Sequence, residues 1–165
     1  MLIYNPAYDI YHCIYRIYNI LKNIKSTDSI ELDRIRIIDF HLVFPSSLVT
    51  IDFPVGFKKI KRKLSNSNYS YREISNKYVT FQTMQPLQVQ AIDFLKSQGY
   101  IDINNLNQIT KNSIFSDLNI NSDISFSNDL DEKDEELLLN FFYKTPLNGA
   151  NSLKKRTKLL EYRYD

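Results

Sequence analysis

The sequence has few of the residue types from which most catalytic and ligand-binding motifs are built. It contains one cysteine, two histidines, three glycines and no tryptophan among 165 residues. A single cysteine excludes an intramolecular disulfide and a multi-cysteine zinc site, and it favours a reducing compartment. With glycine only at positions 56, 99 and 149, no G-x-G-x-x-G, Walker or G-x-S-x-G loop is present. We therefore expect no nucleotide or other cofactor to bind this chain by itself.

Long apolar segments are missing as well. No run approaches the roughly 20 residues that a transmembrane helix needs. Residues 1–6 lack the basic and apolar regions of a signal peptide. A chain of this length can bury enough surface to be stable as one compact domain with an appendage. The sequence thus predicts a soluble, cytoplasmic protein.

The two histidines, His12 and His41, are the only candidates for metal binding or acid–base catalysis. Neither lies in an H-x-x-x-H or H-E-x-x-H spacing, and two histidines without cysteines seldom hold zinc. His12 follows Asp9 by one helical turn, which favours a simple hydrogen bond from His12 to Asp9 or Asn19 on a polar strip. Nothing around Cys13 indicates a lowered thiol pKa, so packing is the favoured role. We predict no catalytic residue, no metal site and no enzyme activity.

An apolar segment over residues 5–24 is predicted to form the central helix. Asn5 followed by Pro6 is typical of an N-cap and a first helical residue. At about 100° per residue, one face carries isoleucines and a leucine, and a tyrosine stripe lies beside it. The tyrosine stripe consists of Tyr8, Tyr11, Tyr15 and Tyr18. Helical spacing favours core or interface over a platform for stacked bases, and tyrosine suits protein interfaces.

Charged residues are grouped rather than dispersed. A short amphipathic helix is expected around a basic block, which consists of Lys58, Lys59, Lys61, Arg62 and Lys63. These cations can contact phosphates or form a solvated face, and the sequence leaves both alternatives open. An acidic block over 129–136 can shield a basic patch, dock on a basic partner or serve as a solvating linker. A second basic block spans 154–158.

Further helices are indicated by capping residues and prolines. Asp28 with Glu31 predicts the start of a helix over 32–44. Pro86 predicts the start of another, which ends near Gly99, and a shorter helix is expected over 71–81.

Residues 100–103 and 108–115 then predict a β-hairpin. An apolar helix is expected over 135–143, with Leu138, Phe141 and Phe142 on it, and a final basic helix over 152–162. The predicted fold class is α+β, mainly α. It comprises a winged-helix-like domain over 1–115 with the hairpin as wing, an acidic flexible loop over 116–131, and a helical C-terminal extension over 132–165 that packs on the core or on a partner.

Two N-terminal motifs carry a family resemblance. Residues 4–13, with the sequence YNPAYDIYHC, and residues 32–40, with the sequence LDRIRIIDF, are followed by Phe44-Pro45. Together they resemble the small middle components of bacterial ABC-three component systems, which are Lamassu-type antiphage defence systems. The resemblance implies a non-catalytic subunit that bridges an SMC-like ABC ATPase and an effector, often a nuclease, in a hetero-oligomer.

Two functions are therefore expected. In the first, the chain is such a bridging subunit, the basic block contacts DNA, and the partner interface is formed by the tyrosine stripe with Leu138, Phe141 and Phe142. In the alternative, it is an autonomous winged-helix regulator that binds DNA. A regulator needs a dimer and a base-reading helix, whereas the candidate helix at 86–98 offers Gln88, Gln90 and Lys96 but little positive charge.

Overall fold

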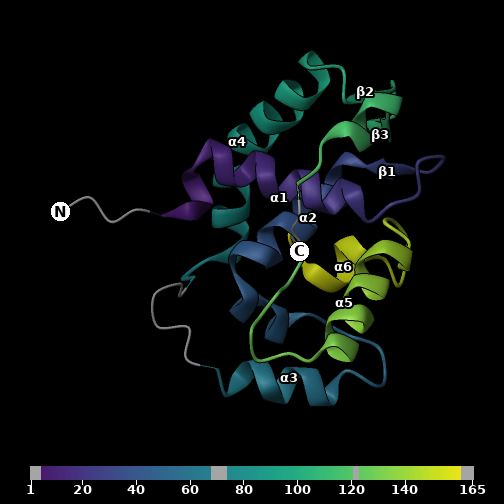
Figure 1. Cartoon of the computed structure of the whole chain (residues 1–165). Coiled ribbons are helices and arrows are strands. Elements are labelled where there is room, and N and C mark those ends of the chain that lie inside the picture. The colour runs from purple at the N-terminus through teal and green to yellow at the C-terminus, as the bar shows by residue number, and fades with distance from the viewer. Residues whose placement is uncertain (1–4, 68–73, 121–122, 161–165) are drawn as a thin grey trace. The chain divides into compact units, whose positions relative to one another are not determined.

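The structure, a computed structural model, describes residues 5–67, 74–120 and 123–160 (Figure 1). It divides into two compact units. Unit 1 comprises residues 1–39 and 83–124, and unit 2 comprises residues 40–82 and 125–165. Helices α2 (Leu32–Val43) and α4 (Lys77–Ser97) each contribute residues to both units. The predicted class, α+β and mainly α, is confirmed, while the winged-helix assignment and the limits of the three predicted regions stay predictions.

The N-terminal helix of unit 1 begins later than the sequence predicts. Asn5 caps only a short 3-10 turn, η1 (Pro6–Tyr8), by accepting the N–H of Ala7. Asp9 then has extended backbone angles and becomes a second N-cap, with its carboxylate accepting the N–H of His12 at 3.0 Å. Helix α1 therefore spans Ile10–Lys22. The predicted continuous helix over 5–24 is wrong at its start because two capping residues compete within one turn.

Unit 1 also contains a three-stranded antiparallel sheet in the order β1-β3-β2. Its strands are β1 (Ser29–Glu31), β2 (Ile101–Ile103) and β3 (Gln108–Lys111), and a 3-10 turn, η3 (Ser113–Asp117), follows. Ile109 in the central strand is paired with Ile30 on one side and Ile103 on the other. The hairpin is confirmed, but its second strand ends at Lys111 and not at residue 115, because η3 begins at Ser113. The glycine expected after α4 is also confirmed, since Gly99 has a φ of 76°. Strand β1 is not predicted, because three residues are too short to show alternation.

Pro86 does not begin a helix but lies inside α4, nine residues from its start. Residues 77–81, expected to belong to a shorter separate helix, are the first turns of α4, and residues 71–73 of that prediction lie outside the described residues. A proline inside a helix removes one intrahelical hydrogen bond and crowds the preceding turn, yet α4 continues through Pro86. Met84 and Ala91 on the two sides of Pro86 are completely buried.

Unit 2 is built around phenylalanine. Its elements are η2 (Pro45–Thr50), α3 (Lys58–Ser65), α5 (Glu132–Lys144) and α6 (Leu153–Thr157). Phe40 meets Phe81 at 5.7 Å between ring centroids, and Phe53 stacks on Phe57 at 4.5 Å. Helix α6 is shorter than the helix predicted over 152–162, because Lys158 adopts a left-handed conformation that ends it. Residues 161–162 of that prediction lie outside the described residues.

The apolar face of α5 lies inside unit 2. Leu138 and Phe142 are completely buried and Phe141 nearly so. Phe142 stacks on Phe126 at 5.3 Å, and the backbone N–H of Phe126 donates to the Glu135 carboxylate at 2.9 Å. Of the predicted loop over 116–131, residues 116–117 belong to η3 and residues 121–122 lie outside the described residues, while Phe126 is part of the core of unit 2. None of the described helices is long and apolar enough to cross a membrane.

Candidate functional site

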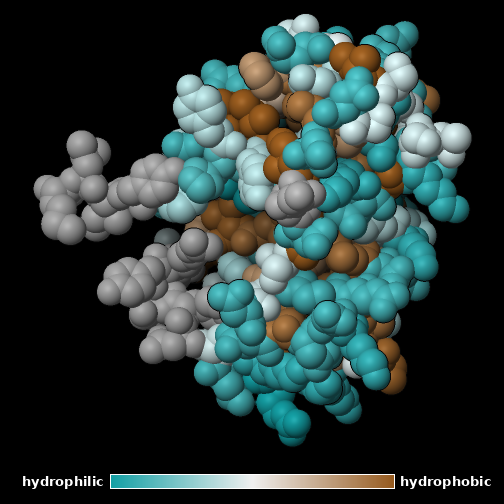
Figure 2. All heavy atoms as spheres, in the orientation of Figure 1, coloured by the Kyte–Doolittle hydropathy of each residue, from teal (hydrophilic) through white to brown (hydrophobic). Residues whose placement is uncertain are grey.

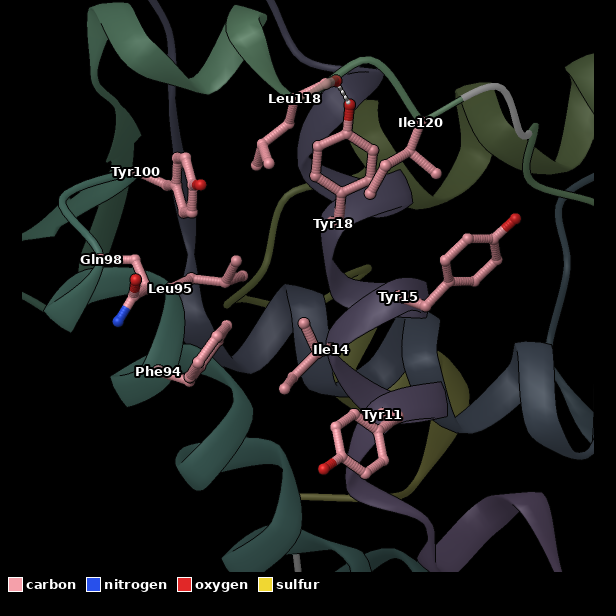
Figure 3. A pocket seen from close by; sticks show the side chains of 10 residues that line it. All are labelled: Tyr11, Ile14, Tyr15, Tyr18, Phe94, Leu95, Gln98, Tyr100, Leu118 and Ile120. Carbon is pink, nitrogen blue, oxygen red and sulfur yellow. Dashed lines mark hydrogen bonds between the residues drawn. The ribbon is translucent and has the colours of Figure 1, made fainter.

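An apolar groove in unit 1 lies between α1 and the C-terminal half of α4 (Figure 3), with a volume of about 320 Å³. Helix α1 forms one wall and α4 the other, and the segment around Leu118 closes one end. We call this feature the tyrosine groove. It is lined by Tyr11, Ile14, Tyr15, Tyr18, Phe94, Leu95, Gln98, Tyr100, Leu118 and Ile120.

Three members of the predicted tyrosine stripe line the groove, and they differ in exposure. Tyr18 is only 4% exposed; its hydroxyl donates to the carbonyl of Leu118 at 2.5 Å and its ring stacks on Phe115. Tyr11 is 79% exposed and Tyr15 43% exposed. Tyr8, on η1, is exposed but does not line the groove. The stripe therefore provides one fixed ring at the base and two rings that solvent reaches.

The opposite wall contains residues that sequence reasoning did not select. Phe94 on α4 is 45% exposed, and in Figure 3 its ring and that of Tyr11 face the space around Ile14. Covering such a side chain is favourable, since full burial of a phenylalanine is worth about 1.5–3 kcal/mol. The sequence alone does not mark Phe94 as exposed, because helical spacing places it beside Ala91 and Leu95, which are buried.

The basic block forms the outer surface of α3 in unit 2, where the surface is largely hydrophilic (Figure 2). Two of its lysines pair with the start of α5. Lys59 Nζ lies 3.3 Å from Asp131 Oδ2, and Lys63 Nζ lies 2.9 Å from the same oxygen. Both lysines also pair with Asp134. The acidic block therefore shields part of the basic block, which is one of the alternatives that the sequence left open.

The other three cations of α3 do not pair with a carboxylate of the described residues. Lys58 and Arg62 are exposed, and Lys61 Nζ lies 5.7 Å from the centroid of the Phe53 ring. Lys58 and Arg62 are four residues apart and so share one face of the helix. The positive surface available to a partner is thus narrower than the five cations of the sequence suggest.

A buried polar network connects α1, α2 and α4 in unit 1. Arg16 Nε donates to Asp39 at 2.5 Å, and its Nη1 donates to the carbonyl of Pro6. Gln88 Nε2 donates to the other oxygen of Asp39 at 2.9 Å, while its Oε1 accepts from Arg36. Burial raises the pKa of the neighbouring Cys13 thiol to about 12, and the charge of Asp39 adds to this effect. Cys13 is therefore a packing residue and not a nucleophile at neutral pH.

His41 is completely buried in unit 2. The Ser47 hydroxyl donates to the carbonyl of Phe44 at 2.5 Å, so it accepts from His41 Nδ1, 2.6 Å away. His41 Nε2 has no hydrogen-bond partner among the described residues. Burial, with a smaller effect from Lys77, lowers the pKa of His41 to about 3. The neutral imidazole of His41 lies in an aromatic core and has no access to a substrate. The other histidine, His12, is exposed on α1.

Within the described residues, no three His, Cys, Asp or Glu side chains lie close enough to hold a metal ion. A family model described as ABC-three component (ABC-3C) system Middle Component 5 matches residues 2–165, nearly the whole chain. No curated protein and no solved structure shows significant similarity to it. The family match covers both the tyrosine groove and the basic helix α3.

Proposed function

Because the chain belongs to the ABC-three component system Middle Component 5 family, we propose that it is a non-enzymatic accessory subunit that links an SMC-like ABC ATPase to an effector subunit. The observation that carries this proposal is the solvent-open tyrosine groove. In this groove, large apolar side chains of unit 1 gather without being fully covered by the other described residues of the unit. A subunit that acts by binding needs such a surface.

The chemistry of the groove suits a protein partner. Binding energy at interfaces is concentrated in a few aromatic residues at the centre of the contact. Tyr11 and Phe94 offer two rings that lose solvent when a partner binds, while Tyr18, held by Leu118 and Phe115, provides a rigid base. We propose that an apolar segment of the ATPase lies along this groove.

Removal of the two exposed rings tests this proposal. Tyr11→Ala combined with Phe94→Ala should lower recovery of the ATPase with the tagged chain by at least about tenfold, since hot-spot truncations cost about 2 kcal/mol or more. Leu106→Ala is the control, because Leu106 is 77% exposed in unit 1 but lies in the hairpin turn and does not line the groove. Equal recovery with both variants would contradict the proposal.

The buried residues of α5 do not enter this interface. Leu138, Phe141 and Phe142 were expected to meet a partner together with the tyrosines, but each is enclosed within unit 2. Leu137, on the other side of α5, is 40% exposed. The partner surface that we propose is therefore the tyrosine groove alone.

A second contact, with DNA, is proposed for α3. Lys58 and Arg62 point to solvent with their charges available, and cations spaced along one helix face can neutralise neighbouring phosphates. We propose that these two residues give the subunit a weak, sequence-independent affinity for duplex DNA. Lys58→Glu with Arg62→Glu should remove it, and unchanged binding at low salt would contradict it.

The alternative, an autonomous DNA-binding regulator, is less well supported. Its base-reading helix would include Gln88, which is completely buried and hydrogen-bonded to Asp39 and Arg36. Gln90 and Lys96 on the same helix are exposed. A regulator would form a dimer and bind one DNA sequence in preference to others, which sedimentation and competition binding would detect.

A further inference from the structure

Two rows of cations run along α3, and only one of them is available. Lys58 and Arg62 form the outer row; Lys59 and Lys63 form the second row, about 100° further around the helix. The second row pairs with Asp131 and Asp134 at the start of α5. Each row has the four-residue spacing that places its two charges side by side.

We propose that Asp131 and Asp134 occupy the positions that DNA phosphates would take against Lys59 and Lys63, and so act as an internal competitor for DNA. This inference rests on the DNA contact proposed above for α3 and adds its regulation. The subunit then has a low-affinity state, in which only Lys58 and Arg62 meet the duplex. It has a higher-affinity state when the start of α5 releases the second row.

The geometry supports a contact that can be exchanged. The Lys59 side chain is 59% exposed and that of Asp131 is 49% exposed, and ion pairs exposed to this extent stabilise a protein by only about 0–1 kcal/mol. Asp134 is 7% exposed and meets Lys63, which makes this the firmer pair. Phosphates gain from the release of counterions when lysines neutralise them, so a nearby duplex can replace the carboxylates.

Contacts at the start of α5 hold the competing carboxylates against α3 in the low-affinity state. Asp131 is also the N-cap of α5, where its Oδ1 accepts the N–H of Asp134 at 3.0 Å. Asp129 accepts from the Ser67 hydroxyl, just beyond the end of α3, at 2.5 Å. The hydrogen bond from Lys63 is the main cause that keeps the pKa of Asp131 well below its usual range. The competing carboxylate is therefore fully charged at neutral pH.

Binding of a short fluorescent DNA duplex to the purified full chain tests the inference. Asp131→Asn with Asp134→Asn removes both competing charges, and asparagine at 131 still caps α5. Each additional phosphate contact steepens the dependence of log affinity on log salt by about 0.9. Two newly available lysines should therefore give this variant a salt slope about 1.8 steeper than that of the wild-type chain.

The matched control removes two acids from the first turns of α5. Glu132→Gln with Glu136→Gln changes the net charge equally, but these exposed residues do not pair with α3. The control should leave the salt slope unchanged. Asp131→Asn alone, at the more exposed position, should give an intermediate slope and serves if the double variant unfolds.

Three results would overturn the inference. If the two double variants bind DNA with equal salt slopes, the effect comes from net charge alone, and the proposed competition by Asp131 and Asp134 is wrong. The proposed DNA contact of α3 is not contradicted by that result. If no variant binds the duplex at low salt, the proposed DNA contact is wrong as well. If the Asp131 and Asp134 variant gains affinity for phosphatidylserine vesicles but not for the duplex, the assignment to nucleic acid is wrong.

Discussion

Arg16 on α1 and Asp39 on α2 form a two-bonded ion pair inside unit 1. Arg16 Nε lies 2.5 Å from one oxygen of Asp39, and Nη2 lies 3.4 Å from the other. The Asp39 side chain is completely buried, and Gln88 on α4 donates to it as well. One carboxylate therefore connects the helix that carries the tyrosines with the helix that carries Phe94.

Loss of the Asp39 carboxylate should destabilise unit 1 strongly. Asp39→Ala leaves the Arg16 guanidinium largely buried without its partner, and breaking such a pair costs about 3–5 kcal/mol. Urea unfolding followed by circular dichroism would measure the loss. Asp93→Ala, at an exposed carboxylate on α4, is the control and should change the free energy of unfolding by less than about 0.5 kcal/mol. Equally small losses in the Asp39 and Asp93 variants would show that the ion pair adds little to the free energy of unfolding.

His41 should make the free energy of unfolding depend on pH. Its pKa falls from 6.5 in the unfolded chain to about 3 in the folded protein, chiefly through burial. Between these values the unfolded chain binds one proton more, so the free energy of unfolding decreases as the pH is lowered through this range.

The slope that His41 contributes approaches about 1.4 kcal/mol per pH unit below pH 6. Urea unfolding at a series of pH values would measure it. His41→Asn should flatten this part of the curve, whereas His12→Asn, at an exposed position, should not. A slope that survives in the His41 variant would contradict the assignment.

Phe142 and Leu137 should respond differently to truncation, although both belong to the apolar segment of α5. Phe142 is completely buried between His41 and Phe126, at 5.4 and 5.3 Å between ring centroids. Phe142→Ala should therefore cost about 3–5 kcal/mol. Leu137→Ala, at a 40% exposed side chain, should cost far less. Thermal unfolding would measure the loss of stability in both variants. A small loss for the Phe142 variant would contradict its burial and favour a partner interface at this segment.

Much of the fold could be predicted from local sequence. Capping residues indicated α2 nearly to the residue, apolar spacing indicated α3, and Gly99 marked the end of α4. The errors occurred where two local signals compete, as Asn5 and Asp9 do before α1, or where packing outweighs propensity, as around Pro86. Strand β1 forms only because β3 is beside it.

The candidate site was predictable on one side only. The tyrosine stripe is visible in the sequence because its members follow one another at helical spacing. Phe94 and Leu118 lie some 80 to 100 residues further along the chain, and nothing local indicates that they meet α1. The pairing of Lys63 with Asp134, 71 residues apart, could not be predicted for the same reason. Blocks of charge suggest binding partners, but only the fold shows which charged side chains already pair with each other within the chain.

Site-specific photocrosslinking in the assembled system tests the tyrosine groove as the partner surface most directly. A benzophenone amino acid in place of Phe94 should form a covalent adduct with the ATPase component, because it replaces one ring of the groove by another. The same group in place of Leu106, exposed in the hairpin of the same unit, should form none. Adducts from position 106 without adducts from position 94 would contradict the account.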